Sequence, residues 1–134
     1  MAEFALHPRL AADTAFVADW DLSRVLLMND ARYPWIVLVP RRAGLGEWHD
    51  LADADAAILT REIRRAGSGL KKLTGAGKIN TAALGNQVPQ LHLHVIARHA
   101  GDAAWPGPVW GHGAARPYET RPRDEFISRL RMGL

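Results

Sequence analysis

The stretch QLHLHVIAR, residues 90–98, alternates polar and apolar side chains in its first half. Successive side chains of a β-strand point to opposite faces of the sheet, so this alternation predicts a strand with one buried face. The apolar members are Leu91, Leu93 and Val95, and the polar members are Gln90, His92 and His94. The apolar set should pack on the core. We therefore expect two imidazoles and one amide side by side on the opposite face of a sheet.

The segments before this strand predict a β-hairpin and then a long helix. Two apolar runs, residues 22–28 (LSRVLLM) and 33–40 (YPWIVLVP), flank the turn-forming sequence NDAR at 29–32. From Asp53 to Gly75 the apolar residues recur at the spacing of an amphipathic helix, at Leu59, Ile63, Ala66, Leu70 and Leu73. Asp50 or Asp53 is the expected N-cap. Gly67 and Gly69 should each weaken the helix by roughly 1 kcal/mol relative to alanine.

The remaining segments complete an α+β domain. Residues 78–84 predict a further strand, and the loop 85–89 (GNQVP) joins it to the opening strand. The segment 105–111 (WPGPVWG) contains two prolines and two glycines, so it should be irregular and cover the site, the core or a partner subunit with its tryptophans. A short helix is expected from Arg123 to Arg131. Residues 1–134 are thus expected to form a single domain, with an antiparallel sheet of about five strands covered by one long helix.

Composition narrows the class of protein. The 134 residues are 48% hydrophobic and 23% charged, as in ordinary soluble globular proteins. No apolar run approaches the roughly 20 residues of a membrane-spanning helix, and the N-terminus does not resemble a secretory signal, so a cytoplasmic location is expected. The absence of cysteine excludes disulfides and thiolate metal sites.

The charge balance favours a small anionic ligand. Seventeen Lys and Arg residues against 14 Asp and Glu give a net charge of +3, and the excess is spread along the chain. Nucleic-acid binding is not expected, since it more often comes with a dense basic stripe. The most basic helical segment, residues 61–65 (REIRR), is expected to be a solvated helix face.

Three interpretations of the histidine pair follow from the residues alone. The two side chains could be half-exposed strand histidines without a role. They could bind a metal ion, but this needs a third or fourth ligand, and His7, His49, His99 and His112 show no recognisable ligand spacing with the pair. They could also act on phosphorus, since a neutral imidazole is nucleophilic and a glycine-containing loop can stabilise negative charge with its N–H groups.

The sequence GNQVPQLHLHVIAR, residues 85–98, resembles the signature of the histidine triad (HIT) family of nucleotide hydrolases and transferases. That signature is His-φ-His-φ-His-φ-φ, where φ is apolar. The preceding hairpin, helix and strand lie where the family has them, so the resemblance extends over residues 22–98, and residues 99–134 form a C-terminal segment and helix. The resemblance implies a HIT-like fold, a nucleotide or dinucleotide substrate, a homodimer, and neither a cofactor nor an obligatory metal.

The resemblance also assigns roles to residues. His92 falls on the family's nucleophile, which attacks the α-phosphorus of a nucleotide and forms a covalent nucleotidyl-imidazole. His94 falls on the third histidine, which binds phosphate oxygens, and Gln90 takes the place of the first. The implied nucleotide-binding residues are Asn29, Asn80, Gly85, Asn86, Gln87 and Trp110. For Asn29 and Asn80 an ordinary turn or strand-end role is an equal alternative.

Departures from the family pattern shape the expected chemistry. Gln90 cannot titrate, although its amide can donate and accept hydrogen bonds. Gln87 stands where the phosphoramidate-cleaving members have a serine that protonates the leaving nitrogen, and Trp35 stands where a histidine is common. Because an amide is a poor general acid, we expect a phosphoanhydride substrate of the dinucleoside polyphosphate type. The alternatives are a nucleotide-binding module with weak or no turnover, and a histidine-based metal-binding protein.

Overall fold

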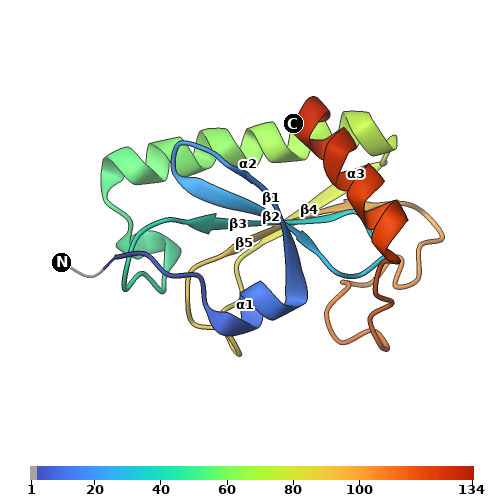
Figure 1. Cartoon of the computed structure of the whole chain (residues 1–134), viewed down its shortest axis with the longest axis horizontal. Coiled ribbons are helices and arrows are strands. Elements are labelled where there is room, and N and C mark those ends of the chain that lie inside the picture. The colour runs from blue at the N-terminus through green and yellow to red at the C-terminus, as the bar shows by residue number, and fades with distance from the viewer. Residues whose placement is uncertain (1–2) are drawn as a thin grey trace.

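The computed structural model describes residues 3–134, which form a five-stranded antiparallel sheet and three α-helices (Figure 1). The strand order is β1-β2-β3-β5-β4. In chain order the elements are α1 (Pro8–Asp13), β1 (Thr14–Asp19), β2 (Ser23–Met28), β3 (Trp35–Pro40), the 3₁₀ turn η1 (Trp48–Asp50), α2 (Asp53–Thr74), β4 (Lys78–Ala82), β5 (Leu93–Arg98) and α3 (Thr120–Gly133). This arrangement confirms the predicted α+β class, an antiparallel sheet of five strands with one long helix and a C-terminal helix.

The predicted hairpin is the centre of the sheet. Strands β2 and β3 pair in antiparallel register, with Val25 opposite Leu38. Every residue of β3 is buried, because the strand lies between two neighbours and is covered on both faces. Its side chains alternate as a strand requires: Ile36 and Leu38 belong to the core under the helices, whereas Val37 and Val39 belong to a second apolar cluster on the other face.

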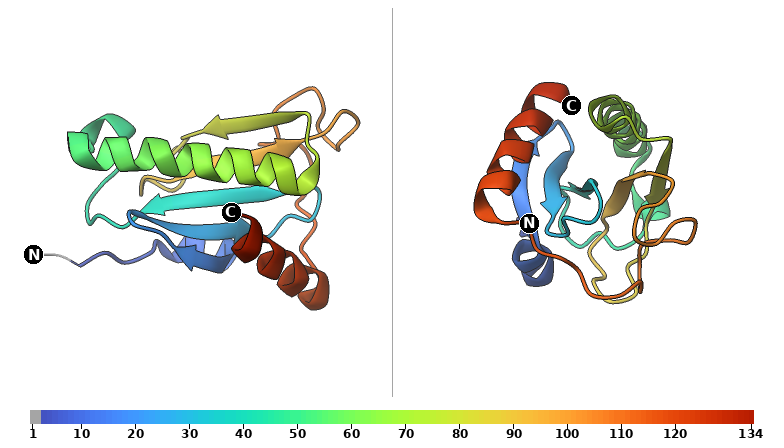
Figure 2. Two further views of the ribbon diagram at one scale, coloured as in Figure 1. Left: turned by 90° about the horizontal axis from the view of Figure 1, so that it is seen from above. Right: turned by 90° about the vertical axis from the view of Figure 1, so that its right-hand side faces the viewer.

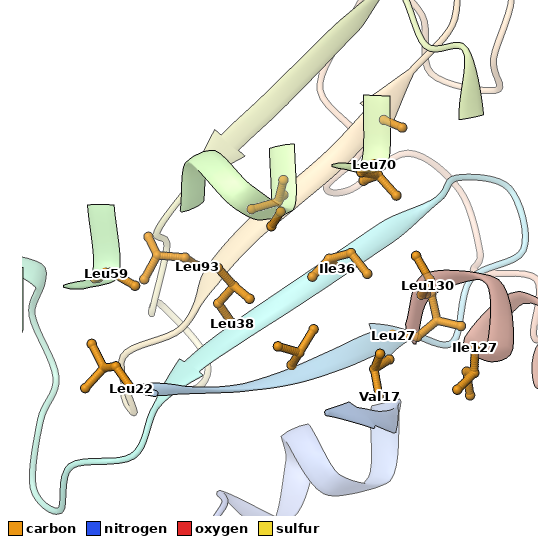
Figure 3. Close-up of a cluster of buried hydrophobic side chains, with 14 of the residues drawn as sticks. Val17, Leu22, Leu27, Ile36, Leu38, Leu59, Leu70, Leu93, Ile127 and Leu130 are labelled. Carbon is orange, nitrogen blue, oxygen red and sulfur yellow. The ribbon is translucent and has the colours of Figure 1, made fainter. Parts of the chain in front are cut away.

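The main core lies between the sheet and the two longer helices. Helix α2 runs over the middle of the sheet and α3 lies beside it (Figure 2). Leu59, Ala66 and Leu70 of α2 are fully buried, as the helical spacing predicted. Figure 3 shows Leu59 and Leu70 in one apolar cluster with Leu38 and Leu93 of the sheet. Removing such side chains from water is worth about 1.5 to 3 kcal/mol each, so this layer dominates the stability of the fold.

The ends of α2 partly differ from the prediction. Gly75 ends the helix in the left-handed conformation, with a φ of 70°. The N-cap is Ala52 rather than Asp50 or Asp53, because Asp50 belongs to η1 and Asp53 is already the first helical residue. Asp53 therefore acts through the helix dipole of the first turn instead of capping.

Gly69 has a packing role that its weak helix propensity concealed. A Cβ atom at this position would lie 2.8 Å from the Leu134 side chain and 2.9 Å from the Gly133 carbonyl oxygen. Neither distance is sterically acceptable, so the missing side chain allows the end of α3 to pack closely on α2. The expected cost in helix propensity is therefore offset by a helix contact.

Glu62 corrects the prediction that residues 61–65 are a solvated helix face. Its side chain is buried, and its two carboxylate oxygens accept hydrogen bonds from the backbone N–H groups of Leu22 and Ser23, both at 3.0 Å. A buried carboxylate needs such charge-assisted partners to offset the loss of hydration. Glu62 thus joins α2 to the start of β2, while Arg61 and Arg64 are exposed.

Several element boundaries also differ from those predicted. Strand β4 ends at Ala82 rather than Leu84, and β5 starts at Leu93, so Gln90 and His92 lie in the loop just before it. Helix α3 is longer than Arg123 to Arg131. The segment 105–111 is irregular, as expected. Among the helices of residues 3–134, none combines the length and the apolar character needed to cross a membrane.

Candidate functional site

A pocket of about 640 Å³ opens on the sheet face opposite α2. It lies where α1, the end of β2, the loop 84–88, the start of β5 and the segment 109–117 come together. Figure 1 shows α1 and the loops after β5 on the side of the sheet away from α2. The strand alternation that buries Leu93 under α2 directs His94 into this pocket. Two members of the polar row predicted for residues 90–98, His92 and His94, therefore line this pocket.

His92 is held in a defined tautomer by the main chain. Its side chain is buried, with Nδ1 2.7 Å from the carbonyl oxygen of Gln90. A carbonyl oxygen can only accept a hydrogen bond, so Nδ1 carries the proton. The lone pair of the neutral ring is then on Nε2. His92 lines the pocket, and the lone pair on its Nε2 is available for nucleophilic attack.

His94 is held in the opposite tautomer by a hydrogen bond from a tryptophan. The indole Nε1–H of Trp35 donates to Nδ1 of His94 at 3.0 Å. Indole can only donate, so Nδ1 carries the lone pair and Nε2 carries the proton. The centroids of the two imidazoles are 4.9 Å apart and their planes meet at 72°. One ring thus has a free lone pair on Nε2, and the next has an N–H donor on Nε2.

Burial keeps His94 uncharged. Desolvation, and secondarily the charge of His92, lowers the pKa of His94 to about 3. The residue is 4% exposed, and its ring lies edge-on to Trp35 and Trp110, at centroid distances of 5.6 and 5.2 Å. His94 is therefore a neutral hydrogen-bond donor over the whole physiological pH range.

This depressed pKa predicts an acid-dependent loss of stability. Between the unfolded pKa of 6.5 and the folded value of about 3, the unfolded chain binds a proton that folded His94 excludes. Stability is therefore complete above the unfolded pKa and falls as the pH is lowered through it. Acidification from pH 7.5 to pH 5 should lower the free energy of unfolding by about 2 kcal/mol through this residue.

Urea unfolding of wild type and His94→Gln at both pH values measures this contribution. The wild type should lose about 2 kcal/mol more than the variant between the two conditions. Asp102, whose pKa the Arg98 guanidinium lowers to about 2, does not titrate in this range. Equal losses in the two proteins would show that His94 takes up a proton in the folded state.

The predicted loop and the second tryptophan also line the pocket. Gly85, Asn86 and Gln87 form part of its wall, and Gly85 has a φ of 80°, a conformation that favours glycine. Trp110 lies edge-on against His94 in the pocket wall, and its indole N–H has no hydrogen-bond partner within residues 3–134. Trp105 lies instead over the guanidinium of Arg98. Of the two tryptophans in the segment 105–111, Trp110 is the one at the pocket.

The three remaining predicted residues have other partners. Asn29 lines the pocket at the end of β2, and its Oδ1 accepts a hydrogen bond from the Tyr118 N–H at 2.8 Å. Asn80 is outside the described lining, where its Oδ1 accepts from Arg98 Nη1. Gln90 is also outside the lining, and its side chain contacts the N-terminal segment. Asn80 and Gln90 thus do not join the histidines in the pocket.

Charged residues of the lining were missed by the sequence analysis. Asp30 is buried and forms a bidentate ion pair with Arg32, with oxygens 2.8 and 3.0 Å from its nitrogens. Burial opposes the ionisation of Asp30, but hydrogen bonds from Arg32 and from the Arg116 amide outweigh it and lower its pKa. Arg9 and Asp13 of α1 also line the pocket. Nothing in the sequence indicated that α1 lies beside the histidine motif, because a helix of six residues is too short to show an apolar stripe.

The pocket contains few groups that could bind a metal ion. Within residues 3–134 no group of three or more His, Asp or Glu side chains is placed to hold one. The pair of His92 and His94 therefore has no third protein ligand in the described part of the chain. The chemistry that the residues themselves offer is a nucleophilic nitrogen beside a neutral N–H donor, next to a glycine-containing loop.

Comparison with known proteins gives consistent matches. The family model described as the HIT domain matches residues 9–101. A histidine triad protein from Sinorhizobium meliloti 1021 is 48% identical, with 98% of this chain and 97% of that chain covered and a TM-score of 0.96. One from Bradyrhizobium japonicum is also 48% identical, with 98% of each chain covered and a TM-score of 0.96. One from Marinobacter aquaeolei VT8 is 45% identical, with 99% and 97% covered and a TM-score of 0.97. No curated protein matches the chain.

Proposed function

The chain belongs to the histidine triad family, and on this basis we propose that it hydrolyses a nucleotidyl phosphoanhydride through a covalent intermediate on His92. The observation that supports this most is the complementary pair of tautomers. His92 has its lone pair on Nε2, because Nδ1 donates to the Gln90 carbonyl oxygen. His94 has its proton on Nε2, because Nδ1 accepts from Trp35. Attack on a phosphate ester or anhydride needs both a nucleophile and a donor to the phosphoryl oxygens.

In the first step, Nε2 of His92 attacks the α-phosphorus of the bound nucleotide. A P–N bond forms as the bond from phosphorus to the bridging oxygen breaks, and its electron pair leaves with the departing phosphate. The ring becomes a cation in the intermediate, and its Nδ1–H remains hydrogen-bonded to the Gln90 carbonyl oxygen, which stabilises the positive charge. His94 donates from Nε2 to a non-bridging oxygen, where negative charge accumulates.

In the second step, water attacks the same phosphorus from the side that the leaving group vacated. The P–N bond breaks and its electron pair returns to Nε2 of His92. The products are a nucleoside monophosphate and one proton, which passes to solvent. The enzyme is then ready for another turnover, with His92 again neutral and protonated on Nδ1.

The leaving group is proposed to be a phosphate chain rather than an amine. Gln87 lines the pocket, but a carboxamide does not release a proton near neutral pH. A di- or triphosphate leaves as an anion without protonation, whereas an amine leaves poorly unless an acid protonates it. A dinucleoside polyphosphate is the substrate type that best satisfies this condition.

Intact-protein mass spectrometry tests the covalent step. The wild type is mixed with a dinucleoside polyphosphate and quenched within milliseconds in alkaline denaturant, because the P–N bond of a nucleotidyl-imidazole hydrolyses in acid. We expect a mass increase of one nucleotidyl group, on the peptide that contains His92. A protein that only binds nucleotides would give neither the adduct nor a nucleoside monophosphate, and that result would reject the proposed reaction.

A further inference from the structure

The side-chain amide of Gln90 is hydrogen-bonded to the N-terminal segment through both its oxygen and its nitrogen. Its Oε1 accepts a hydrogen bond from the His7 backbone N–H, and its Nε2 donates to the Ala5 carbonyl oxygen, both at 2.8 Å. These partners lie 83 and 85 positions away in the sequence. One amide therefore binds the two backbone groups on either side of Leu6, as a residue of a neighbouring strand would. Gln90, which stands at the first position of the triad, thus links the N-terminal segment to the start of the motif.

The contact continues from His7 to Arg9. The Nδ1 atom of His7 accepts a hydrogen bond from the Arg9 backbone N–H, at 3.1 Å, and so caps α1. Leu10, the next residue, is buried in the apolar cluster on this face of the sheet. Gln90 fixes His7, His7 fixes the start of α1, and α1 carries Arg9 to the wall of the pocket. The backbone carbonyl of Gln90 meanwhile orients His92.

Two arginines of residues 3–134 line the pocket, and Arg9 is the one whose ion pair is weak enough to be exchanged for a ligand. The other one, Arg32, forms a bidentate ion pair with Asp30 and donates to the His112 carbonyl oxygen at 2.6 Å. The ion pair of Arg9 with Asp13 is long, at 3.7 Å, and both side chains are more than half exposed. Exposed pairs of this kind contribute little. A phosphate group can replace Asp13, since guanidinium binds phosphate with two parallel hydrogen bonds.

We propose that Gln90 positions the N-terminal segment so that Arg9 binds a phosphate of the substrate beyond the one that His92 attacks. The site then selects nucleotides with a chain of two or more phosphates over nucleoside monophosphates. This rests on the proposed function, since it assumes that a nucleotide occupies the pocket. Gln90 is a positioning residue in this scheme: it acts through His7 and the start of α1 and does not touch the phosphate chain.

Calorimetric binding of two stable ligands tests the role of Arg9. The ligands are AMP and the α,β-methylene analogue of ATP, which has the same base and ribose but is not cleaved at the α-phosphorus. The wild type should bind the analogue about tenfold more tightly than AMP, the effect of one charge-assisted contact. In Arg9→Gln the ratio should fall to near one, with the affinity for AMP unchanged. Arg121→Gln, an exposed arginine of α3, is the matched control and should keep the wild-type ratio.

Hydrogen exchange separates positioning by Gln90 from a local structural role. In Gln90→Ala the His7 amide should lose its protection, and the preference for the analogue should fall as in Arg9→Gln. The double variant Arg9→Gln/Gln90→Ala should lose no more preference than either single variant, because both act on one contact. In Arg9→Gln the His7 amide should stay protected. If Gln90→Ala exposes the His7 amide but keeps the tenfold preference, positioning by Gln90 is refuted.

The outcomes distinguish this inference from the proposed reaction. If Arg9→Gln keeps the wild-type ratio, or if the wild type binds both ligands equally, Arg9 does not bind the phosphate chain. That result would not contradict the proposed hydrolysis or the proposed adduct on His92. If the wild type binds neither ligand, both the proposed function and the role of Arg9 are refuted.

Discussion

Replacing His92 with alanine is expected to lower kcat for a dinucleoside polyphosphate by at least about 1,000-fold, with KM changed by much less. Alanine removes the Nε2 lone pair and leaves the other walls of the pocket in place. Binding should persist because the rest of the pocket lining, including residues 84–88 and Trp110, is unchanged. The loss should therefore appear in the chemical step, measured by release of nucleoside monophosphate under single-turnover conditions.

His99→Ala is a suitable control for this substitution. His99 is partly buried, but it lies outside the described pocket lining and its ring contacts the Thr74 carbonyl oxygen. Its replacement should leave kcat within about threefold of the wild-type value, as is usual for residues away from the chemistry. Equal activity of His92→Ala and wild type would contradict the role of His92.

Stereochemistry at phosphorus distinguishes a nucleophile from a general base. With oxygen-18 water as the nucleophile, two successive in-line displacements, first by His92 and then by water, retain the configuration of a chiral α-phosphorothioate substrate. Direct attack by water, with His92 acting only as a base, inverts it. We expect retention, and inversion would exclude the covalent intermediate even if His92→Ala were inactive.

The elements that sequence analysis identified are those with strong local patterns. The hairpin was predictable because β3 is apolar throughout and is preceded by turn-forming residues. Helix α2 was predictable because its buried residues repeat at helical spacing over 22 residues. By contrast, β1 was missed because its burial hardly alternates: Val17 is buried, Phe16 is half exposed, and the register with β2 shifts between Phe16 and Ala18.

Only part of the candidate site could be predicted from local patterns in the sequence. The strand period indicated that His92 and His94 share a face, and the motif pointed to the loop that contains Asn86. The contacts that select each tautomer join residues far apart in the chain, such as Trp35 and His94, which are 59 positions apart. Arg9 lies in the pocket wall because α1 places it there, and α1 is too short to show a detectable apolar stripe in the sequence. Such long-range contacts depend on the assembled sheet and not on local pattern.

Trp35→Phe is expected to lower kcat about 10- to 100-fold, less than the complete removal of a donor to the transition state. Phenylalanine keeps an aromatic ring against Tyr33, His94 and Trp110 but lacks the indole N–H. Without that donor, Nδ1 of His94 can take the proton, and Nε2 then presents a lone pair to the phosphoryl oxygens. Repulsion between this lone pair and the oxygens replaces a hydrogen bond. The defect should therefore appear in kcat more than in KM.

Nitrogen-15 NMR of the His94 ring separates this effect from a loss of packing. The wild type should show the tautomer with the proton on Nε2 from pH 5 to pH 8, because burial holds the pKa of His94 near 3. In Trp35→Phe the tautomer with the proton on Nδ1 should become populated, and the pKa of His94 should rise because the neutral form has lost a hydrogen-bond donor. Trp105→Phe, at an exposed tryptophan outside the described pocket lining, should change neither the NMR signal nor kcat.

Trp35→His provides the restoring variant. An imidazole at position 35 has one ring N–H that can donate to Nδ1 of His94, so it should recover part of the activity that Trp35→Phe loses, although it fills less of the pocket wall. A packing role for Trp35 predicts the reverse order, because phenylalanine preserves more apolar contact than histidine does. If Trp35→Phe were as active as wild type and kept the proton on Nε2, the tautomer of His94 would have to be fixed by another group. The role proposed for Trp35 therefore depends on the order of the two variants as well as on the size of either effect.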